Sequence, residues 1–139
     1  MNAVMKQCEN QIMLFFRYLD ECRYDALVAL LAPDAIWRRQ GKVLKGPQQV
    51  RQALQQRSQT MTIAHIITNL VFDDCDTRHC SIRGYMQVYR HESGQPVQGP
   101  CPLRGVESIR NIQIRMMLVA DGWQIAELSA EETIFSAKT

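Results

Sequence analysis

Four long segments rich in β-branched and aromatic residues make up the second half of the chain. They span residues 61–73, 79–91, 106–120 and 123–133. Most of the stretches between them are short and turn-forming, at residues 73–76, Ser93-Gly94 and Asp121-Gly122. Long strand-like segments joined by short turns predict neighbouring antiparallel strands. We therefore expect one mainly antiparallel sheet, which must bury one face against another layer.

The first half of the chain supplies helices for that second layer. In residues 4–22 the apolar side chains recur at steps of three and four, which places them on one stripe of a helix. A second helical stretch, residues 24–32, is expected to stop at Pro33, and a third begins at Pro47. Two short strands, residues 35–37 and 43–45, are expected between the second and third helices.

These segments predict an α+β fold in which about three N-terminal helices pack on a strongly curved sheet and enclose a pocket. The length of 139 residues suits one domain, and no repeat or linker divides the chain, so we expect residues 1–139 to form a single domain. Residues 96–105 hold three prolines and two glycines. We expect them to form a longer loop over the pocket mouth or the sheet edge.

Charge and composition argue against several classes of protein. The chain has 16 basic and 14 acidic side chains, no run of five like charges, and no basic patch with interleaved aromatics, so we expect no nucleic-acid partner. Lys6, Glu9 and Arg17 interrupt the N-terminal apolar pattern, which indicates neither a signal peptide nor a membrane span. We therefore expect a cytoplasmic protein with no membrane partner.

Five cysteines at irregular spacing contain no C-x-x-C pair and favour reduced thiols over a disulfide framework. His79 and Cys80 are adjacent instead of lying at ligand spacing, so no metal site is expected.

Several short motifs along nearly the whole chain resemble those of one family. They are Phe16-Arg17-Tyr18-Leu19-Asp20, Tyr24-Asp25-Ala26-Leu27, Asp34-Ala35-Ile36-Trp37, Lys45-Gly46-Pro47, His65-Ile66-Ile67-Thr68-Asn69 and Asp121-Gly122-Trp123-Gln124-Ile125. In order and spacing they resemble the SnoaL-like branch of the nuclear-transport-factor-2-like superfamily. The resemblance implies a cystatin-like cone of helices and a bent sheet around a pocket.

Within that superfamily the chain is similar to hexachlorocyclohexane dehydrochlorinases and scytalone dehydratases at Asp20 and His65. The resemblance implies that His65 is the base of an elimination and that Asp20 orients it, with no cofactor. Two departures weigh against the chemistries of scytalone dehydratases and of ketosteroid isomerases. A second histidine of the dehydratase pattern falls near Met86, and the carboxylate of the isomerases falls near Arg38 or Arg39.

The same two residues stand out by position. Asp20 lies at the border of the first helix's apolar stripe, and His65 alternates with Ile63, Ile67 and Asn69 in a strand. The opposite face of that strand is also apolar, so the direction of His65 stays open. A carboxylate bonded to one imidazole nitrogen fixes the tautomer and leaves the other nitrogen free to accept a proton. Alternatively, a buried Asp and His pair only ties the helix to the sheet.

Further candidates for a ligand pocket follow from side-chain type. Aromatic and sulfur side chains suit an apolar ligand, although plain core packing is the more frequent use for them. An inward arginine, Arg115 or Arg83, would hold a leaving group or a carboxylate. The candidate substrate-binding residues are Tyr18, Trp37, Asn69, Tyr85, Met86 and Arg115.

The function expected from the sequence is a cofactor-independent lyase or isomerase that acts on a small apolar organic molecule. Two alternatives remain: a non-catalytic small-molecule-binding domain, and an accessory β subunit of a ring-hydroxylating dioxygenase, which the chain also resembles. A homodimer formed through the sheet is expected, because an exposed apolar sheet face favours pairing.

Overall fold

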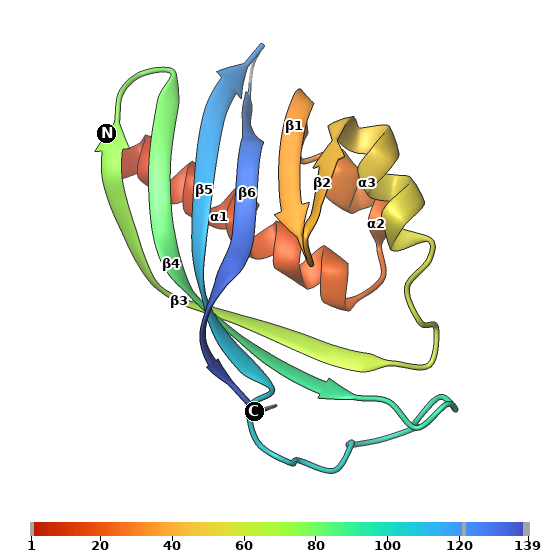
Figure 1. Ribbon diagram of the computed structural model, residues 1–139. Helices are drawn as coiled ribbons and strands as arrows, with labels where there is room; N and C mark the ends of the chain where they lie inside the picture. Colours follow the sequence, from red (N-terminus) through yellow and green to blue (C-terminus); the bar gives the residue numbers. More distant parts are fainter. Residues whose placement is uncertain (1, 121, 138–139) are drawn as a thin grey trace.

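The computed structural model describes residues 2–120 and 122–137, which form three helices and six strands (Figure 1). The helices are α1 (Asn2–Asp20), α2 (Tyr24–Val28) and α3 (Gly46–Leu54). The strands are β1 (Leu31–Arg39), β2 (Lys42–Lys45), β3 (Thr62–Cys75), β4 (His79–His91), β5 (Ser108–Val119) and β6 (Gly122–Ser136). The predicted turn at Asp121 lies outside the described residues.

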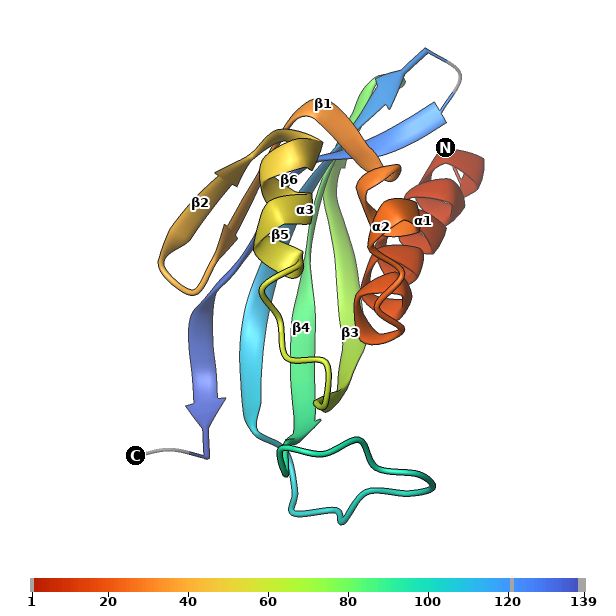
Figure 2. The same cartoon turned by 90° about the vertical axis from the view of Figure 1, so that its right-hand side faces the viewer.

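All six strands belong to one sheet in the order β2-β1-β6-β5-β4-β3. Every neighbouring pair is antiparallel except β1 and β6, which run parallel. The long strands bend sharply, and α1 crosses the concave side of the sheet while α2 and α3 cover the β1 and β2 end (Figures 1 and 2). The α+β fold with helices on a curved, mainly antiparallel sheet is thus confirmed.

The core lies between the stripe of α1 and the concave face of the sheet. Cys8, Ile12 and Phe15 on α1 are at most 1 % exposed, and they meet inward residues of β5 such as Ile112 and Met116, which are fully buried. Full burial of such a side chain contributes about 1.5–3 kcal/mol. The predicted amphipathic stripe therefore anchors the helix layer to the sheet.

The second helix is shorter than predicted, because the chain enters β1 before Pro33. Leu31 pairs with Ile125 of β6, and the Ile125 N–H donates to the Leu30 carbonyl at 2.9 Å. Pairing with the sheet buries the apolar side chains of this segment as well as a helix packed on the core would. Pro33 is exposed within an irregular stretch of the β1 and β6 register, where its missing N–H removes no ladder bond.

A bulge in β3 changes which residues face inward. Asn69 adopts a positive φ of 56°, and the pairing with β4 shifts register between Thr68 and Val71. Beyond the bulge Leu70 packs on the core, whereas Asn69 is exposed and Val71 is 41 % exposed. A simple two-residue alternation from His65 to Asn69 is therefore wrong.

Cys75 and Cys80 form a disulfide across the hairpin that joins β3 to β4. The expectation that all the cysteines are reduced thiols is wrong for this pair, because hairpin pairing places the two residues directly opposite each other, which sequence spacing did not reveal. Cys8, Cys22 and Cys101 are free. In the described part of the chain, no helix has both the length and the apolar character to cross a membrane.

Candidate active site

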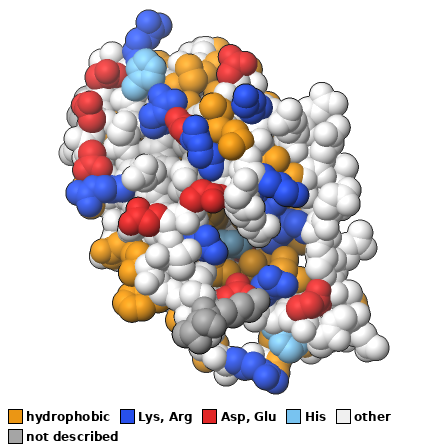
Figure 3. Space-filling view, in the orientation of Figure 1, with side chains coloured by type: hydrophobic (Ala, Val, Ile, Leu, Met, Phe, Trp, Pro, Cys, Tyr) orange, Lys and Arg blue, Asp and Glu red, His pale blue; other side chains and the backbone are white. Residues whose placement is uncertain are grey.

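A cavity of about 390 Å³ opens between the concave face of the sheet, the C-terminal half of α1, α3 and the β1–β2 hairpin. Its walls include Phe16 and Leu19 from α1, Trp37 from β1, and Met86 and Val88 from β4. In the space-filling view, Lys and Arg side chains gather around a hollow with hydrophobic atoms at its base (Figure 3). The volume falls in the usual range for small-molecule sites.

His65 lines this cavity, and Asp20, which is not among the lining residues, contacts it. His65 Nδ1 lies 2.5 Å from Asp20 Oδ1, and the His65 backbone N–H donates to Asp20 Oδ2 at 2.9 Å. Their side chains are only 9 % and 15 % exposed for His65 and Asp20 respectively. Asp20 is the last residue of α1, so the helix end delivers its carboxylate to β3.

This geometry favours one tautomer of the His65 ring. An ionised carboxylate can only accept hydrogen bonds, so Nδ1 of His65 is the donor. The neutral ring then keeps a lone pair on Nε2, which bonds to none of the described residues, and His65 lines the cavity. A ring held in this way can accept a proton from a bound molecule, and the carboxylate stabilises the resulting cation.

Two of the six predicted substrate-binding residues line the cavity. Trp37 is 5 % exposed and packs edge-on against Phe15 at 5.1 Å between ring centroids. Met86 is likewise 5 % exposed and belongs to the cavity wall. Tyr18 does not line the cavity; its ring packs against the core and lies beneath the Arg23 guanidinium at 4.9 Å.

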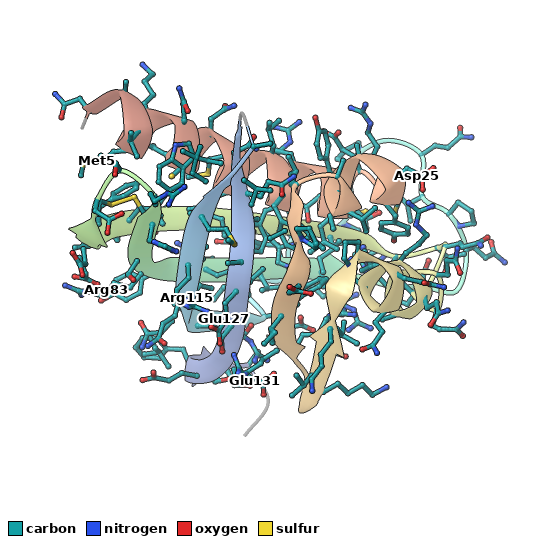
Figure 4. The ribbon with its side chains drawn as sticks, turned by 90° about the horizontal axis from the view of Figure 1, so that it is seen from above. Met5, Asp25, Arg83, Arg115, Glu127 and Glu131 are labelled. Carbon is teal, nitrogen blue, oxygen red and sulfur yellow. A yellow bond between two sulfur atoms is a disulfide. The ribbon has the colours of Figure 1, made fainter. Side chains whose placement is uncertain are left out.

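The structure directs Asn69, Tyr85 and Arg115 away from the cavity. In β4 the buried positions are even-numbered from Cys80 to Val88, so Tyr85 points outward and is 44 % exposed. Arg115 alternates with buried residues of β5 in the same way and pairs with Glu127 at 2.8 Å. Figure 4 shows Arg83 and Arg115 on the side of the sheet opposite α1. Neither arginine is therefore inward, which was the condition for holding a ligand in this cavity.

The loop at residues 96–105 contributes nothing to the cavity wall. It lies within an irregular connection between the ends of β4 and β5, which projects beyond the sheet (Figure 2). Because β4 and β5 are interior strands, the loop lies beyond the strand ends and not along an edge strand of the sheet.

Sequence reasoning missed the basic side chains of the cavity. Five line it: Arg39, Lys42, Arg57, Arg90 and Arg110. The signal for three of them was strand alternation. Arg39 follows the buried pair Ala35 and Trp37, Arg90 follows Met86 and Val88, and Arg110 lies between buried Ser108 and Ile112.

The electrostatics of this basic group are unusual at Arg39. Burial lowers the pKa of its guanidinium, and the nearby charge of Arg57 lowers it further. Its guanidinium carbon lies 4.9 Å from the centroid of the Trp37 ring, a cation–π geometry. A buried cation next to another cation is stabilised by an anion placed between them.

Within residues 2–120 and 122–137, no three His, Cys, Asp or Glu side chains cluster closely enough to hold a metal ion.

A bent sheet, helices across its concave side and an internal pocket together define a cystatin-like cone. Residues 4–129 match the SnoaL-like domain family, and the protein belongs to that family. The predicted resemblance is thereby confirmed. None of the curated proteins matches the chain.

Several solved structures share the fold, three of them from Novosphingobium aromaticivorans. A candidate scytalone dehydratase is 14% identical with a TM-score of 0.79, covering 99% of this chain and 88% of that one. An NTF2-like protein with a cystatin-like fold is 14% identical with a TM-score of 0.76, covering 96% and 84%. A candidate aromatic ring hydroxylase is 13% identical with a TM-score of 0.74, covering 93% and 87%. At these identities the likeness concerns the fold.

Proposed function

We propose that the protein is a cofactor-independent lyase or isomerase for a small, largely apolar organic molecule. In this proposal His65 is the general base, and Asp20 holds its ring in the tautomer that leaves Nε2 free. The observation that carries the proposal is the contact of Asp20 with His65, whose side chain lines a cavity of about 390 Å³.

The reaction we propose begins with removal of a proton from a carbon atom of the bound molecule by Nε2 of His65. In an elimination the electron pair of that C–H bond forms a double bond while a leaving group departs from the adjacent carbon. In an isomerisation the proton returns to another carbon. A positioned base of this kind contributes about 10² to 10⁴ in rate.

Proton nuclear magnetic resonance in D₂O tests both reactions at once. The protein would be incubated with a panel of cyclic ketones, β-hydroxy ketones and chlorinated cyclohexanes. Loss of the acidic C–H signal reports proton exchange, and new vinyl signals report elimination. We expect His65→Gln, which removes the base, to slow the reaction about 10² to 10⁴-fold.

His79→Gln is the matched control, because His79 is exposed at the start of β4, away from the cavity. Unchanged turnover in His65→Gln would overturn the proposal. Tight binding of a panel member that survives His65→Ala, without turnover by the wild type, would instead support the non-catalytic binding domain. Co-purification with a large oxygenase chain would support the accessory β subunit.

We also propose that residues 1–139 act as one domain and pair as a homodimer through the outer face of the sheet. Large apolar side chains are exposed there, among them Ile66 at 42 % and Tyr85 at 44 %. A cytoplasmic location stays a prediction from the sequence.

A further inference from the structure

Ten of the twelve arginines of this protein fall into two groups, and Arg78 and Arg104 belong to neither. Six form ion pairs with carboxylates: Arg17, Arg23, Arg38, Arg51, Arg83 and Arg115. The four that line the cavity, Arg39, Arg57, Arg90 and Arg110, have no carboxylate within 4.0 Å in the described part of the chain, and neither does Lys42. Positive charge is thus left without a carboxylate partner in the wall of this cavity.

Three of the four cavity arginines are held in place by neutral groups. Arg39 stacks on Trp37, and an Arg110 N–H donates to the Ala130 carbonyl at 3.1 Å. Arg57 donates to the Leu19 carbonyl at 2.9 Å and to the Tyr24 hydroxyl at 3.0 Å. These contacts fix the side chains and leave their positive charge unneutralised, as a preorganised anion site requires.

Acidic groups near the cavity do not neutralise this charge. Glu107 is the one carboxylate among the lining residues. The carboxylate of Asp20 is bonded to His65. Glu92 is near enough to Arg90 for the arginine charge to lower the Glu92 pKa slightly, but the chief cause of that lowering is hydrogen bonding from Ser58, to which Thr60 adds.

We infer that the cavity binds an amphipathic organic anion, with its apolar body against Phe16, Ile63 and Met86 and its carboxylate or phosphate group among the arginines. Guanidinium groups recognise both anions through paired N–H donors. This inference refines the ligand class of the proposed function and uses the same cavity.

The sheet register sets the scale of such a ligand. His65 pairs with Val88, and Arg90 is two residues further along β4, opposite Ile63. Two residues of a strand span about 7 Å. An anionic group bound by Arg90 would therefore be separated from the carbon atom that faces His65 by about the width of one ring.

Isothermal titration with three matched probes tests the inference: 2-naphthoate, 2-naphthyl phosphate and the neutral 2-naphthalenemethanol. We expect at least one of the two anions to bind at least tenfold more tightly than the alcohol. Raising NaCl from 50 to 500 mM should weaken binding of the anion and not of the alcohol. The preferred anion identifies whether the site takes carboxylates or phosphates.

Variants then assign the site. Arg39→Gln and Arg110→Gln should each remove most of the preference for the anion, whereas Arg83→Gln, which alters an outward arginine, should leave it unchanged. Circular dichroism checks that each variant is folded. If one of the two cavity variants fails to fold, the other still tests the inference. Equal binding of anion and alcohol, or an anion preference that survives both cavity variants, would overturn the inference.

Binding to His65→Gln separates this inference from the proposed catalysis. We expect His65→Gln to keep the preference for the anion, since the glutamine removes the base and leaves the arginines in place. Anion binding without turnover in the wild type would contradict the proposed function alone. Turnover of neutral compounds without any preference for anions would contradict the anion site alone.

Discussion

The carboxylate of Asp20 bonds to both the ring and the backbone of His65. One oxygen is 2.5 Å from Nδ1 and the other accepts from the backbone N–H at 2.9 Å. Because β3 is an edge strand with β4 as its single neighbour, its outward backbone groups have no strand partner. Asp20 thus satisfies an edge N–H and orients the ring with the same group, which couples the end of α1 to the cavity wall.

Replacing Asp20 should therefore cost stability as well as activity. Asp20→Ala leaves the His65 N–H and Nδ1 without partners in a site that is largely buried, a loss of about 1–3 kcal/mol. Urea unfolding measures it. Asp25→Ala is the control, because Asp25 pairs with Arg51 while its side chain is 87% exposed, and we expect a loss under about 1 kcal/mol. Equal losses in the two variants would contradict a structural role for the Asp20 contacts.

Sequence patterns predicted the fold and the Asp20 and His65 pair because both depend on local signals. The stripe of α1 and the long β-rich segments follow from periodicity, and the pair follows from motifs in order along the chain. The basic side chains were missed for a different reason. Arg39 and Arg110 look like solvated strand residues until the sheet places them on its concave face.

The remaining errors arose where tertiary pairing overrode local preference. The apolar run at Leu31 suits a helix or a strand, and pairing with Ile125 decides between them. The bulge at Asn69 reverses the face of the sheet on which each later residue of β3 lies. Counting residues along the strand does not reveal this change. The Cys75 and Cys80 disulfide likewise depends on the hairpin register.

Gly84 should be intolerant of a side chain, because it faces the bulge of β3. A Cβ atom there would lie 2.7 Å from Leu70 Cδ2 and 3.1 Å from the Thr68 carbonyl oxygen. The leucine can rotate, but the backbone oxygen must shift, so Gly84→Ala should destabilise the fold by about 1–3 kcal/mol. Gly122→Ala, where a Cβ meets nothing within 4 Å, is the control in thermal unfolding. A Gly84→Ala variant as stable as this control would show that the bulge adjusts freely.

The proposed homodimer predicts a mass of twice 16.0 kDa by light scattering after size-exclusion chromatography. Tyr85→Lys places a charge on the outer face of the sheet and should shift the mass to that of the monomer. Lys is also expected to leave the concave side unaffected, since Tyr85 points away from the cavity. A monomeric wild type, or a dimer that survives Tyr85→Lys, would contradict pairing through this part of the face.

Glu127 should make the free energy of unfolding depend on pH in the acidic range. It lies on β6 between Arg38 of β1 and Arg115 of β5, and Figure 4 shows it beside Arg115. Hydrogen bonding from Arg38 is the main cause that lowers the Glu127 pKa below its ordinary value of 4.5; Arg115 adds to it and partial burial opposes it.

A carboxyl group whose pKa is lower in the folded chain binds protons more readily in the unfolded chain. Its contribution to stability is therefore complete above pH 4.5 and is lost as the pH falls through the lower folded pKa. We expect the free energy of unfolding to fall less between pH 6 and about 3 in Glu127→Gln than in the wild type. Glu132→Gln is the control, because Glu132 is exposed and has no ion pair in the described part of the chain. An identical acid dependence in wild type and Glu127→Gln would show that the arginine contacts of Glu127 do not stabilise the folded state.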